Sequence, residues 1–515
     1  MLFLKKTLPI LLAVFVLSVI VRLPQLNRPL AKHHEFCTAV SLRVLEIWNK
    51  NGITPFKANP VMNYGNPADK FINNHANTSG KMLDKKGNYY YVSHPPFAYY
   101  FPYFVFKILN IKPTVLSLQI LNLCLHFLSA LFVYFTVLLL SFKQARNNLH
   151  FSSFVAYCIY LFMPTTLWFQ GNIYMSDMAV HLPYIIGVYT VLKMIIRQRF
   201  HSYKYQILYA FILGMMIYTS WLGVFFAFGV LVYALIHVRQ IKGFRILIIN
   251  TLFISFLTLR LISFQYAQIN GLLAYAEEAI TRYLVRGSIA ETSQGYFHFI
   301  FSYLYYFKTL LFNYFINYLP FYIIIVGFFI FSFSKKKMKI TFTENGYRFL
   351  WLSILPIVLL HLIFLNYSVH DFTTLYASLF FSVLAGIIYD KIKKSGNVSP
   401  QKLNTIYLFL IGLMLVQYTA FNLPGDKSIK GFSYDTYQKA GAFIATNSST
   451  DEVLFMYDEP TPEIVLYAHR NIKHISTEAE AFSFLKFRNL KKGVIFEGKI
   501  ENNFQSFKTK KIILE

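Results

Sequence analysis

Three short polar clusters carry the side chains that could do chemistry in a chain that is otherwise largely apolar. His33-His34-Glu35 lies between two hydrophobic runs, Asp177 stands at the start of a later run, and His370-Asp371 directly precedes another. Carboxylates and imidazoles accept protons and bind phosphate or metal ions. Ionisable groups at a membrane boundary are costly and usually functional. If the fold brings these clusters to one side, they predict a catalytic site.

The composition places the chain among multi-span membrane proteins. Hydrophobic residues make up 56% of its 515 residues and charged residues only 14%, whereas a soluble domain carries about a quarter charged residues. A net charge of +26 would suggest nucleic acid binding in a soluble protein. Here the basic residues mostly lie in short segments between apolar runs, where they set topology and contact anionic headgroups. We therefore expect membrane lipids as neighbours and no nucleic acid.

Hydropathy and charge together predict about eleven membrane-spanning helices. A span needs roughly 20 apolar residues, and basic loops stay on the cytoplasmic side. If Lys5 and Lys6 lie inside, the segment 24–96 is external and every basic loop is cytoplasmic. The expected spans cover residues 7–23, 115–141, 150–168, 177–196, two within 207–237, 246–266, 312–334, 348–366, 373–389 and 403–421, with an interfacial helix over 97–109.

The last part of the chain has a different pattern. After Pro424, short helical patterns alternate with short runs that are typical of strands, which indicates a small α/β domain. We expect helices over 434–446, 461–469 and 477–489, and strands over 453–457, 472–475, 493–497 and 511–514. The chain is thus divided into a transmembrane domain, 1–424, which includes the external loop 24–96, and an external domain, 425–515.

With this topology all three polar clusters lie on the external side, but each has a structural alternative. A carboxylate at the start of a helix can cap it and interact favourably with its dipole. Glu35, Asp177 and Asp371 all stand at such positions. A divalent metal ion as a cofactor is a further open alternative, with His33, His34, Glu35 and His75 as its ligands.

The order of these motifs resembles the GT-C membrane glycosyltransferases. The similar members are the dolichyl-phosphate-mannose protein mannosyltransferases and the bacterial transferases that add aminoarabinose to lipid A. The most specific pieces are Tyr91-Val-Ser-His-Pro-Pro-Phe97 and His370-Asp-Phe-Thr-Thr-Leu-Tyr376, and the resemblance covers about residues 1–390. It implies an α-helical polytopic membrane protein of GT-C-like architecture, a polyprenyl-phosphate sugar donor, and an envelope lipid, glycan or protein acceptor.

The resemblance also implies roles for individual residues. The family's first external loop bears an acidic pair, usually Asp-Glu, where this chain has His34-Glu35. Glu35 is then the expected catalytic base, with His34 as an alternative base. Asp177 matches the second acidic position, which helps organise the site. His94 matches the family's His-Pro-Pro turn, whose prolines rigidify the entry to the following helix.

Charge stabilisation of a departing lipid phosphate requires cations on the same side. Arg282 and Arg286 stand four residues apart on an expected external helix and are candidates for this role. Their alternative is an ordinary interfacial position. His370 and Asp371 are expected to bind phosphate or to orient the site.

Two other function classes remain open. A transporter or flippase of lipid-linked saccharides would have similar spans, together with internal repeats and polar groups at mid-membrane depth. A non-catalytic assembly subunit is compatible with the histidine at position 34. We expect a glycosyltransferase in the cytoplasmic (inner) membrane, with its N-terminus in the cytoplasm. Its active site and C-terminal domain then lie on the external or periplasmic face.

Overall fold

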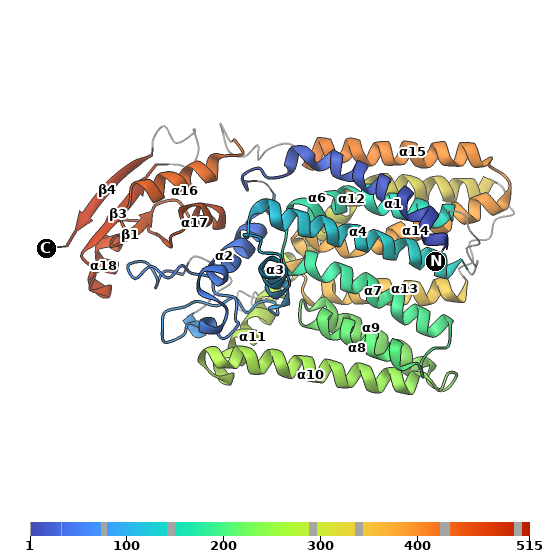
Figure 1. Cartoon of the computed structure of the whole chain (residues 1–515), viewed down its shortest axis with the longest axis horizontal. Helices are drawn as coiled ribbons and strands as arrows, with labels where there is room; N and C mark the ends of the chain where they lie inside the picture. The colour runs from blue at the N-terminus through green and yellow to red at the C-terminus, as the bar shows by residue number, and fades with distance from the viewer. Residues whose placement is uncertain are drawn as a thin grey trace.

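Long apolar helices form the larger part of the protein, and a small sheet lies beyond one end of the helix bundle (Figure 1). The computed structural model describes residues 2–31, 33–73, 80–141, 150–287, 296–334, 343–422, 433–498 and 507–514. The N-terminus and the sheet lie at opposite ends of the molecule (Figure 1).

Within the described residues, eight helical segments are long and apolar enough to cross a membrane. A ninth is possible if α5 (Phe151–Phe162) and α6 (Pro164–Asn172) count as one span that bends by 58°. The eight lie in α1 (Leu2–Arg22) with η1 (Leu23–Gln25), α4 (Val115–Leu140), α7 (Ser176–Ile196), α10 (Phe244–Asn270), α12 (Tyr296–Ser334), α13 (Glu344–Ile363), η6 (Asp371–Ala377) with α14 (Ser378–Ser395), and α15 (Pro400–Gln417) with η7 (Tyr418–Asn422).

The expected stretch 207–237 does break into two helices, as its length indicated. These are α8 (Tyr203–Ile217, 15 residues) and α9 (Leu222–His237, 16 residues), which are shorter than a typical span of roughly 20 residues. A Cβ atom at Gly223 would lie only 2.4 Å from the backbone nitrogen of Ile217, so the tight turn between the helices requires glycine there. Each expected span coincides with a helix or a helix pair, although the number of spans stays a prediction.

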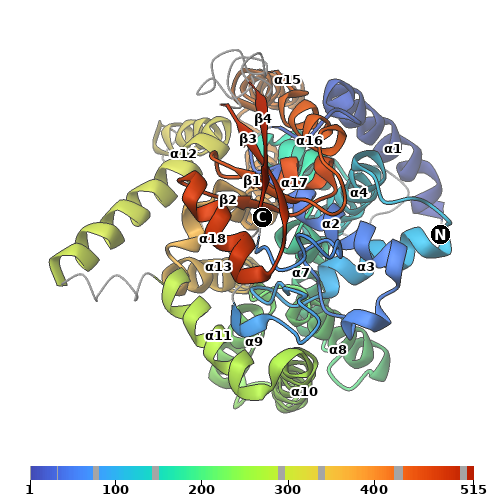
Figure 2. The same ribbon diagram turned by 90° about the vertical axis from the view of Figure 1, so that its left-hand side faces the viewer.

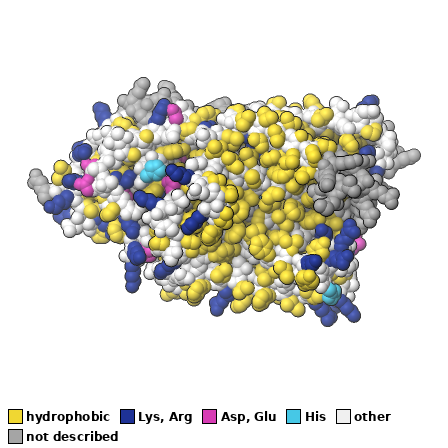
Figure 3. Space-filling model, in the orientation of Figure 1, with side chains coloured by type: hydrophobic (Ala, Val, Ile, Leu, Met, Phe, Trp, Pro, Cys, Tyr) yellow, Lys and Arg dark blue, Asp and Glu magenta, His cyan; other side chains and the backbone are white. Residues whose placement is uncertain are grey.

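Burial shows which helices are central. In α7, 78% of the apolar stretch is buried, whereas in α10 the share is 22%. Hydrophobic side chains cover the outer surface of the bundle, and Lys and Arg gather toward its two ends (Figure 3). An apolar surface of this extent is expected where helices face lipid. The protein is therefore a multi-pass membrane protein in which α7 lies in the interior.

The described residues between α1 and α4 lie at the sheet end of the bundle (Figure 1). It contains α2 (Phe36–Asn51) and α3 (Phe97–Ile108), with the short turns η2 (Thr54–Phe56) and η3 (Gly80–Met82) between them. The Trp48 ring of α2 stacks on Tyr100 of α3 with 5.6 Å between ring centroids. Pro96 is the N-cap residue of α3, which agrees with the rigid entry expected from the sequence.

The C-terminal part is the small α/β structure that the sequence predicted. Strand order is β2-β1-β3-β4; β1 is parallel to β2 and β3, and β4 is antiparallel to β3. The helices α16 and α17 pack on one sheet face and α18 on the other. The bounds are α16 (Thr436–Thr446), β1 (Val453–Met456), α17 (Pro462–Ala468), β2 (Ile472–His474), α18 (Glu478–Arg488), β3 (Lys492–Glu497) and β4 (Lys508–Ile513).

The loop after α2 is tied to this sheet structure. Ala68 and Ile72 belong to the hydrophobic cluster beneath α18. The Asp69 carboxylate pairs with Arg470, and Asn471 donates to the same carboxylate at 2.8 Å. Seen from the sheet end, the strands and α17 lie in front of α2 (Figure 2). A hydrophobic cluster and a buried ion pair thus join the C-terminal structure to the segment between α2 and α3.

A buried carboxylate in α17 makes this packing dependent on pH. Burial raises the pKa of Glu463 to about 7, and the charge of nearby Glu35 acts in the same direction. A carboxyl whose pKa is raised on folding destabilises the folded state as the pH rises from about 4.5 to about 7.

We expect Glu463→Gln to protect the amides of α17 from hydrogen exchange more strongly than wild type at pH 8, by about 2 kcal/mol of opening free energy. At pH 4.5 the two proteins should differ little, because the wild-type carboxyl is then protonated in the folded state and still about half protonated in the open state. The exposed Glu459→Gln is the matched control. If the amides of α17 are equally protected in wild type and Glu463→Gln at pH 8, the pKa of Glu463 is not raised by folding.

Candidate active site

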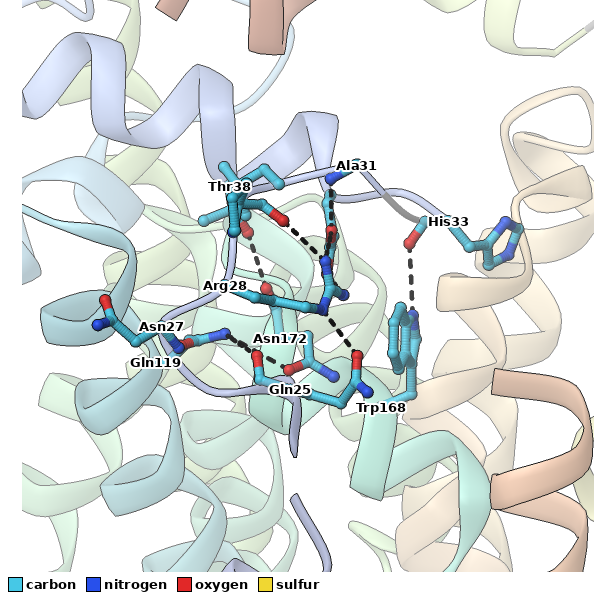
Figure 4. A network of polar contacts seen from close by, with 12 residues as sticks. Gln25, Asn27, Arg28, Ala31, His33, Thr38, Gln119, Trp168 and Asn172 are labelled. Carbon is cyan, nitrogen blue, oxygen red and sulfur yellow. Dashed lines mark hydrogen bonds and ion pairs between the residues drawn. The ribbon is translucent and has the colours of Figure 1, made fainter. Parts of the chain in front are cut away.

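The loop that links α1 to α2 is held against two other helices by polar contacts (Figure 4). The backbone N–H of Asn27 donates to Gln119 of α4 at 2.8 Å. The indole of Trp168 in α6 donates to the His33 carbonyl at 3.4 Å, and the Thr38 hydroxyl donates to the carbonyl of Asn172 at 3.1 Å. These contacts fix the first histidine cluster beside α6.

Glu35 lies in an ion pair inside this loop. The guanidinium of Arg28 binds both carboxylate oxygens, and the Ala31 N–H donates to Oε2 at 2.8 Å. The Glu35 side chain is 1% exposed. It is the N-cap residue of α2, but its side chain makes no capping hydrogen bond. Its carboxylate is therefore neither the helix cap nor part of the histidine cluster.

The two histidines meet Asp371, which is far away in the sequence. His33 Nε2 donates to Asp371 Oδ2 at 2.8 Å, and His34 Nε2 lies 2.8 Å from Oδ1. His34 has a left-handed backbone with φ of 59°, which costs a non-glycine residue about 1–3 kcal/mol. The side chain of His33 is 57% exposed and that of Asp371 22%, so a substrate can reach this cluster.

Three of the site imidazoles are neutral near pH 7. Burial lowers the pKa of His34, although Asp371 acts in the opposite direction. Burial, and then the electrostatic interaction with the nearby His34 imidazole, lower the pKa of His370 to about 4. Burial and then Arg286 hold the pKa of His94 well below its usual value. Neutral imidazoles can accept protons or bind metal ions.

Asp177 is the buried centre of the site. The Tyr367 hydroxyl donates to its Oδ2 at 2.7 Å, the Tyr376 hydroxyl donates to Oδ1, and Asp177 is 1% exposed. The N-cap residue of α7 is Met175, and no side chain caps this helix. The carboxylate thus links α7 to the segment formed by η5 (Tyr367–Val369) and η6, and capping does not account for it.

Arg286 supplies a buried cation next to Asp177. It ends α11 (Leu272–Arg286), the helix expected to carry both arginines. Its Nη2 lies 3.1 Å from His94 Nε2, and its guanidinium lies 4.5 Å over the Tyr367 ring. Nη1 is buried and makes no hydrogen bond within the described part of the chain. Arg282, one turn earlier, donates to Glu278 at 2.6 Å.

The Tyr367 ring lies between His370, which is next to the exposed histidine cluster, and His94, which is next to the buried Arg286. Its centroid lies 5.9 Å from that of His370 and 5.6 Å from that of His94. His370 in turn lies 5.5 Å from the His34 ring. The structure therefore brings six of the eight predicted residues together, while Arg282 is paired with Glu278 and Glu35 with Arg28. The six are His34, His94, Asp177, Arg286, His370 and Asp371.

The sequence predicted no role for Tyr367 or Tyr376, and for His33 only that of a metal ligand. Both tyrosines flank the His370-Asp371 motif, but the chain contains 38 tyrosines, and these two have no distinguishing pattern. His33 was identified with the first cluster but not as a partner of Asp371, since that contact spans more than 300 residues.

His33, His34 and Asp371 could also hold a metal ion. One ligand atom from each lies within 4.8 Å of the others. The Oδ1 atom of Asp371 makes no hydrogen bond among the described residues, despite lying 2.8 Å from His34 Nε2. When a nitrogen and an oxygen atom bind the same metal ion, they can lie this close without a hydrogen bond between them. Imidazole and carboxylate groups are both ligands of Zn²⁺. Glu35 is not in this group, and His75 lies outside the described residues.

Comparisons with known proteins identify the architecture. No protein-family model and no curated protein match the sequence. AglB, the oligosaccharyltransferase of Archaeoglobus fulgidus, in complex with an inhibitory peptide and a dolichol-phosphate, matches with a TM-score of 0.57 and 11% identity, over 96% of this chain and 70% of its own. ArnT from Cupriavidus metallidurans bound to undecaprenyl phosphate matches with a TM-score of 0.56 and 10% identity, over 94% and 93%.

The chain has the GT-C fold. This confirms the fold expected from the motifs, an α-helical polytopic membrane protein with a small C-terminal α/β structure. The Archaeoglobus fulgidus oligosaccharyltransferase in complex with Zn and sulfate is also similar, with a TM-score of 0.57 and 12% identity over 94% of this chain and 67% of its own.

The metal interpretation of the exposed cluster predicts a specific loss. Asp371→Asn removes the negative charge between the two imidazoles, so we expect Zn²⁺ affinity of the purified protein to fall at least about tenfold in equilibrium dialysis. The matched control is Asp390→Asn, in α14, whose carboxylate pairs with Lys394. Unchanged Zn²⁺ affinity of Asp371→Asn would remove this carboxylate from the ligand set.

Proposed function

We propose that the protein is a glycosyltransferase that moves a sugar from a polyprenyl-phosphate donor to an envelope lipid, glycan or protein. One observation carries the proposal: in a GT-C fold, the rings of Tyr367 and His370 connect the accessible His33–Asp371 pair with a buried cation, Arg286. The similar structures in complex with a dolichol-phosphate and with undecaprenyl phosphate support this donor class.

The His33–Asp371 pair is the proposed proton acceptor. A carboxylate that accepts the Nε2–H of an imidazole orients the ring and leaves Nδ1 as the basic nitrogen. As the acceptor hydroxyl attacks the anomeric carbon, its proton passes to this imidazole. The role that the sequence gave to Glu35 moves to this pair, because Arg28 and the Ala31 N–H occupy the Glu35 carboxylate.

Arg286 is the proposed binding group for the donor phosphate. When the bond between the anomeric carbon and the phosphate oxygen breaks, negative charge develops on that oxygen. The buried guanidinium has an uncommitted donor in Nη1 and can stabilise this charge with a charge-assisted hydrogen bond. Asp177 positions the guanidinium through Tyr367, whose ring lies beneath it.

A metal ion is a second use of the exposed cluster. His33, His34 and Asp371 would hold it, and it would supply positive charge close to the donor phosphate. The similar oligosaccharyltransferase structure that contains Zn and sulfate supports this alternative. A chelator distinguishes the two uses, since only the metal-bound arrangement loses activity when the ion is removed.

The topology expected from the sequence completes the proposal. The N-terminus and the candidate site lie toward opposite ends of the bundle, which supports a cytoplasmic N-terminus and an external site (Figure 1). We place the protein in the cytoplasmic (inner) membrane with residues 425–515 as an external domain, because the basic loops then all face the cytoplasm.

The test is sugar transfer in proteoliposomes that contain undecaprenyl-phosphate carrying a labelled sugar. We expect Asp177→Asn and His33→Gln each to lower turnover by about 10²–10⁴-fold, because one misplaces Arg286 and the other removes the proton acceptor. Asp390→Asn, at the other end of α14, should retain wild-type turnover. Movement of the labelled donor across the bilayer without transfer to any acceptor would contradict the proposal and favour a flippase.

A further inference from the structure

A cavity of about 620 Å³ lies between α2, the first external loop and the C-terminal α/β structure. Ligand sites in proteins have volumes of about 300–1,000 Å³. Three segments that are distant in sequence form its walls, so it exists only in the folded chain. Its polar lining includes Glu46, Lys50, Tyr64, Asn66, Thr450 and His469.

The groups in this cavity carry both signs of charge. The Glu46 Oε2 atom accepts from the Tyr64 hydroxyl at 3.1 Å and lies 3.3 Å from His469 Nδ1. Lys50 and Thr450 make no side-chain hydrogen bond within the described part of the chain. The surface view shows a histidine with acidic and basic side chains around it over α17 (Figure 3). A mixed set of donors and acceptors fits a ligand with many hydroxyl groups better than it fits an anion, which Glu46 would repel.

The cavity walls are held in place before any ligand arrives. The backbone N–H and carbonyl of Tyr64 both bond to the Asn471 side chain, each at 2.9 Å. Arg470 pairs with Asp69 and also donates to the Glu452 carbonyl at 2.6 Å. Rigid walls lower the entropy that binding must overcome. Tyr64 also lines the cavity, and its ring lies 6.1 Å from that of His469.

The helix α2 connects this cavity with the candidate active site. His34 lies just before α2, which begins at Phe36, and Glu46 lies ten residues after Phe36, which corresponds to about 15 Å along the axis. A single sugar cannot span this distance, whereas a short oligosaccharide can.

We propose that this cavity is a carbohydrate subsite that binds the part of a glycan acceptor remote from the reacting hydroxyl. The inference rests on the proposed glycosyl transfer, because it narrows the acceptor to a glycan or a glycan-bearing molecule. The C-terminal structure then has two roles: it braces the external loop and it completes the acceptor site.

The experiment is an array of immobilised neutral, amino and acidic oligosaccharides, probed with the full chain in lipid nanodiscs without donor. We expect binding of at least one oligosaccharide, weakened at least tenfold in Glu46→Gln and also weakened in Tyr64→Phe, which removes the hydroxyl that bonds Glu46. Glu459→Gln, an exposed glutamate outside the cavity, is the matched control and should bind like wild type.

Three results would overturn the subsite. They are the absence of binding to every oligosaccharide, equal binding by wild type and Glu46→Gln, and displacement of the bound glycan by millimolar inorganic phosphate, which would indicate an anion site. Hydrolysis of the labelled donor is measured in parallel and should not change in Glu46→Gln. If the wild-type protein binds glycans but does not turn over the donor, the proposed transferase activity is contradicted and the subsite is not. If it turns over the donor but binds no glycan, only the subsite is contradicted.

Discussion

The buried carboxylate of Asp177 is the contact on which the site geometry depends. A carboxylate at 1% exposure needs hydrogen bonds to both oxygens, and it receives them from Tyr367 and Tyr376. Hydrogen bonds to a charged group contribute roughly 1.5–3 kcal/mol each. Since both tyrosines belong to the segment η5–η6, the same contact fixes His370 and Asp371, which lie between them in sequence. The Tyr367 ring then supports the Arg286 guanidinium. One carboxylate thereby orders the cation and the exposed cluster together.

In the segment between α1 and α3, buried charges are likewise paired, and the pairs join separate parts of the chain. Arg28 and Glu35 close the turn before α2, while Asp69 and Arg470 tie the loop to the sheet structure. These pairs are largely removed from water, so breaking one would leave an uncompensated buried charge. The candidate site and the proposed glycan subsite lie near the two ends of α2, which these pairs hold in place.

Local patterns predicted most of the fold. Hydropathy located the long apolar helices among the described residues, although α12 begins at Tyr296 and not at 312, and the span expected over 150–168 is two helices, α5 and α6. Strand and helix patterns located the four strands and three helices of the C-terminal structure, because both signals depend on neighbouring residues. Six of eight predicted site residues were brought together, since ionisable groups near span ends are rarely there by chance. The pairing of Glu35 with Arg28 was not predictable, because it depends on a turn within the loop. The partnership of His33 with Asp371, and the roles of Tyr367 and Tyr376, arise from contacts between distant helices that leave no local pattern.

The most direct test of the account is a cryo-EM structure of the full chain in nanodiscs with undecaprenyl phosphate. We expect density for the phosphate within hydrogen-bonding distance of the Arg286 guanidinium, on the side of the His33–Asp371 pair. Phosphate density at another position, with Arg286 still in contact only with His94 and Tyr367, would contradict the proposed donor site.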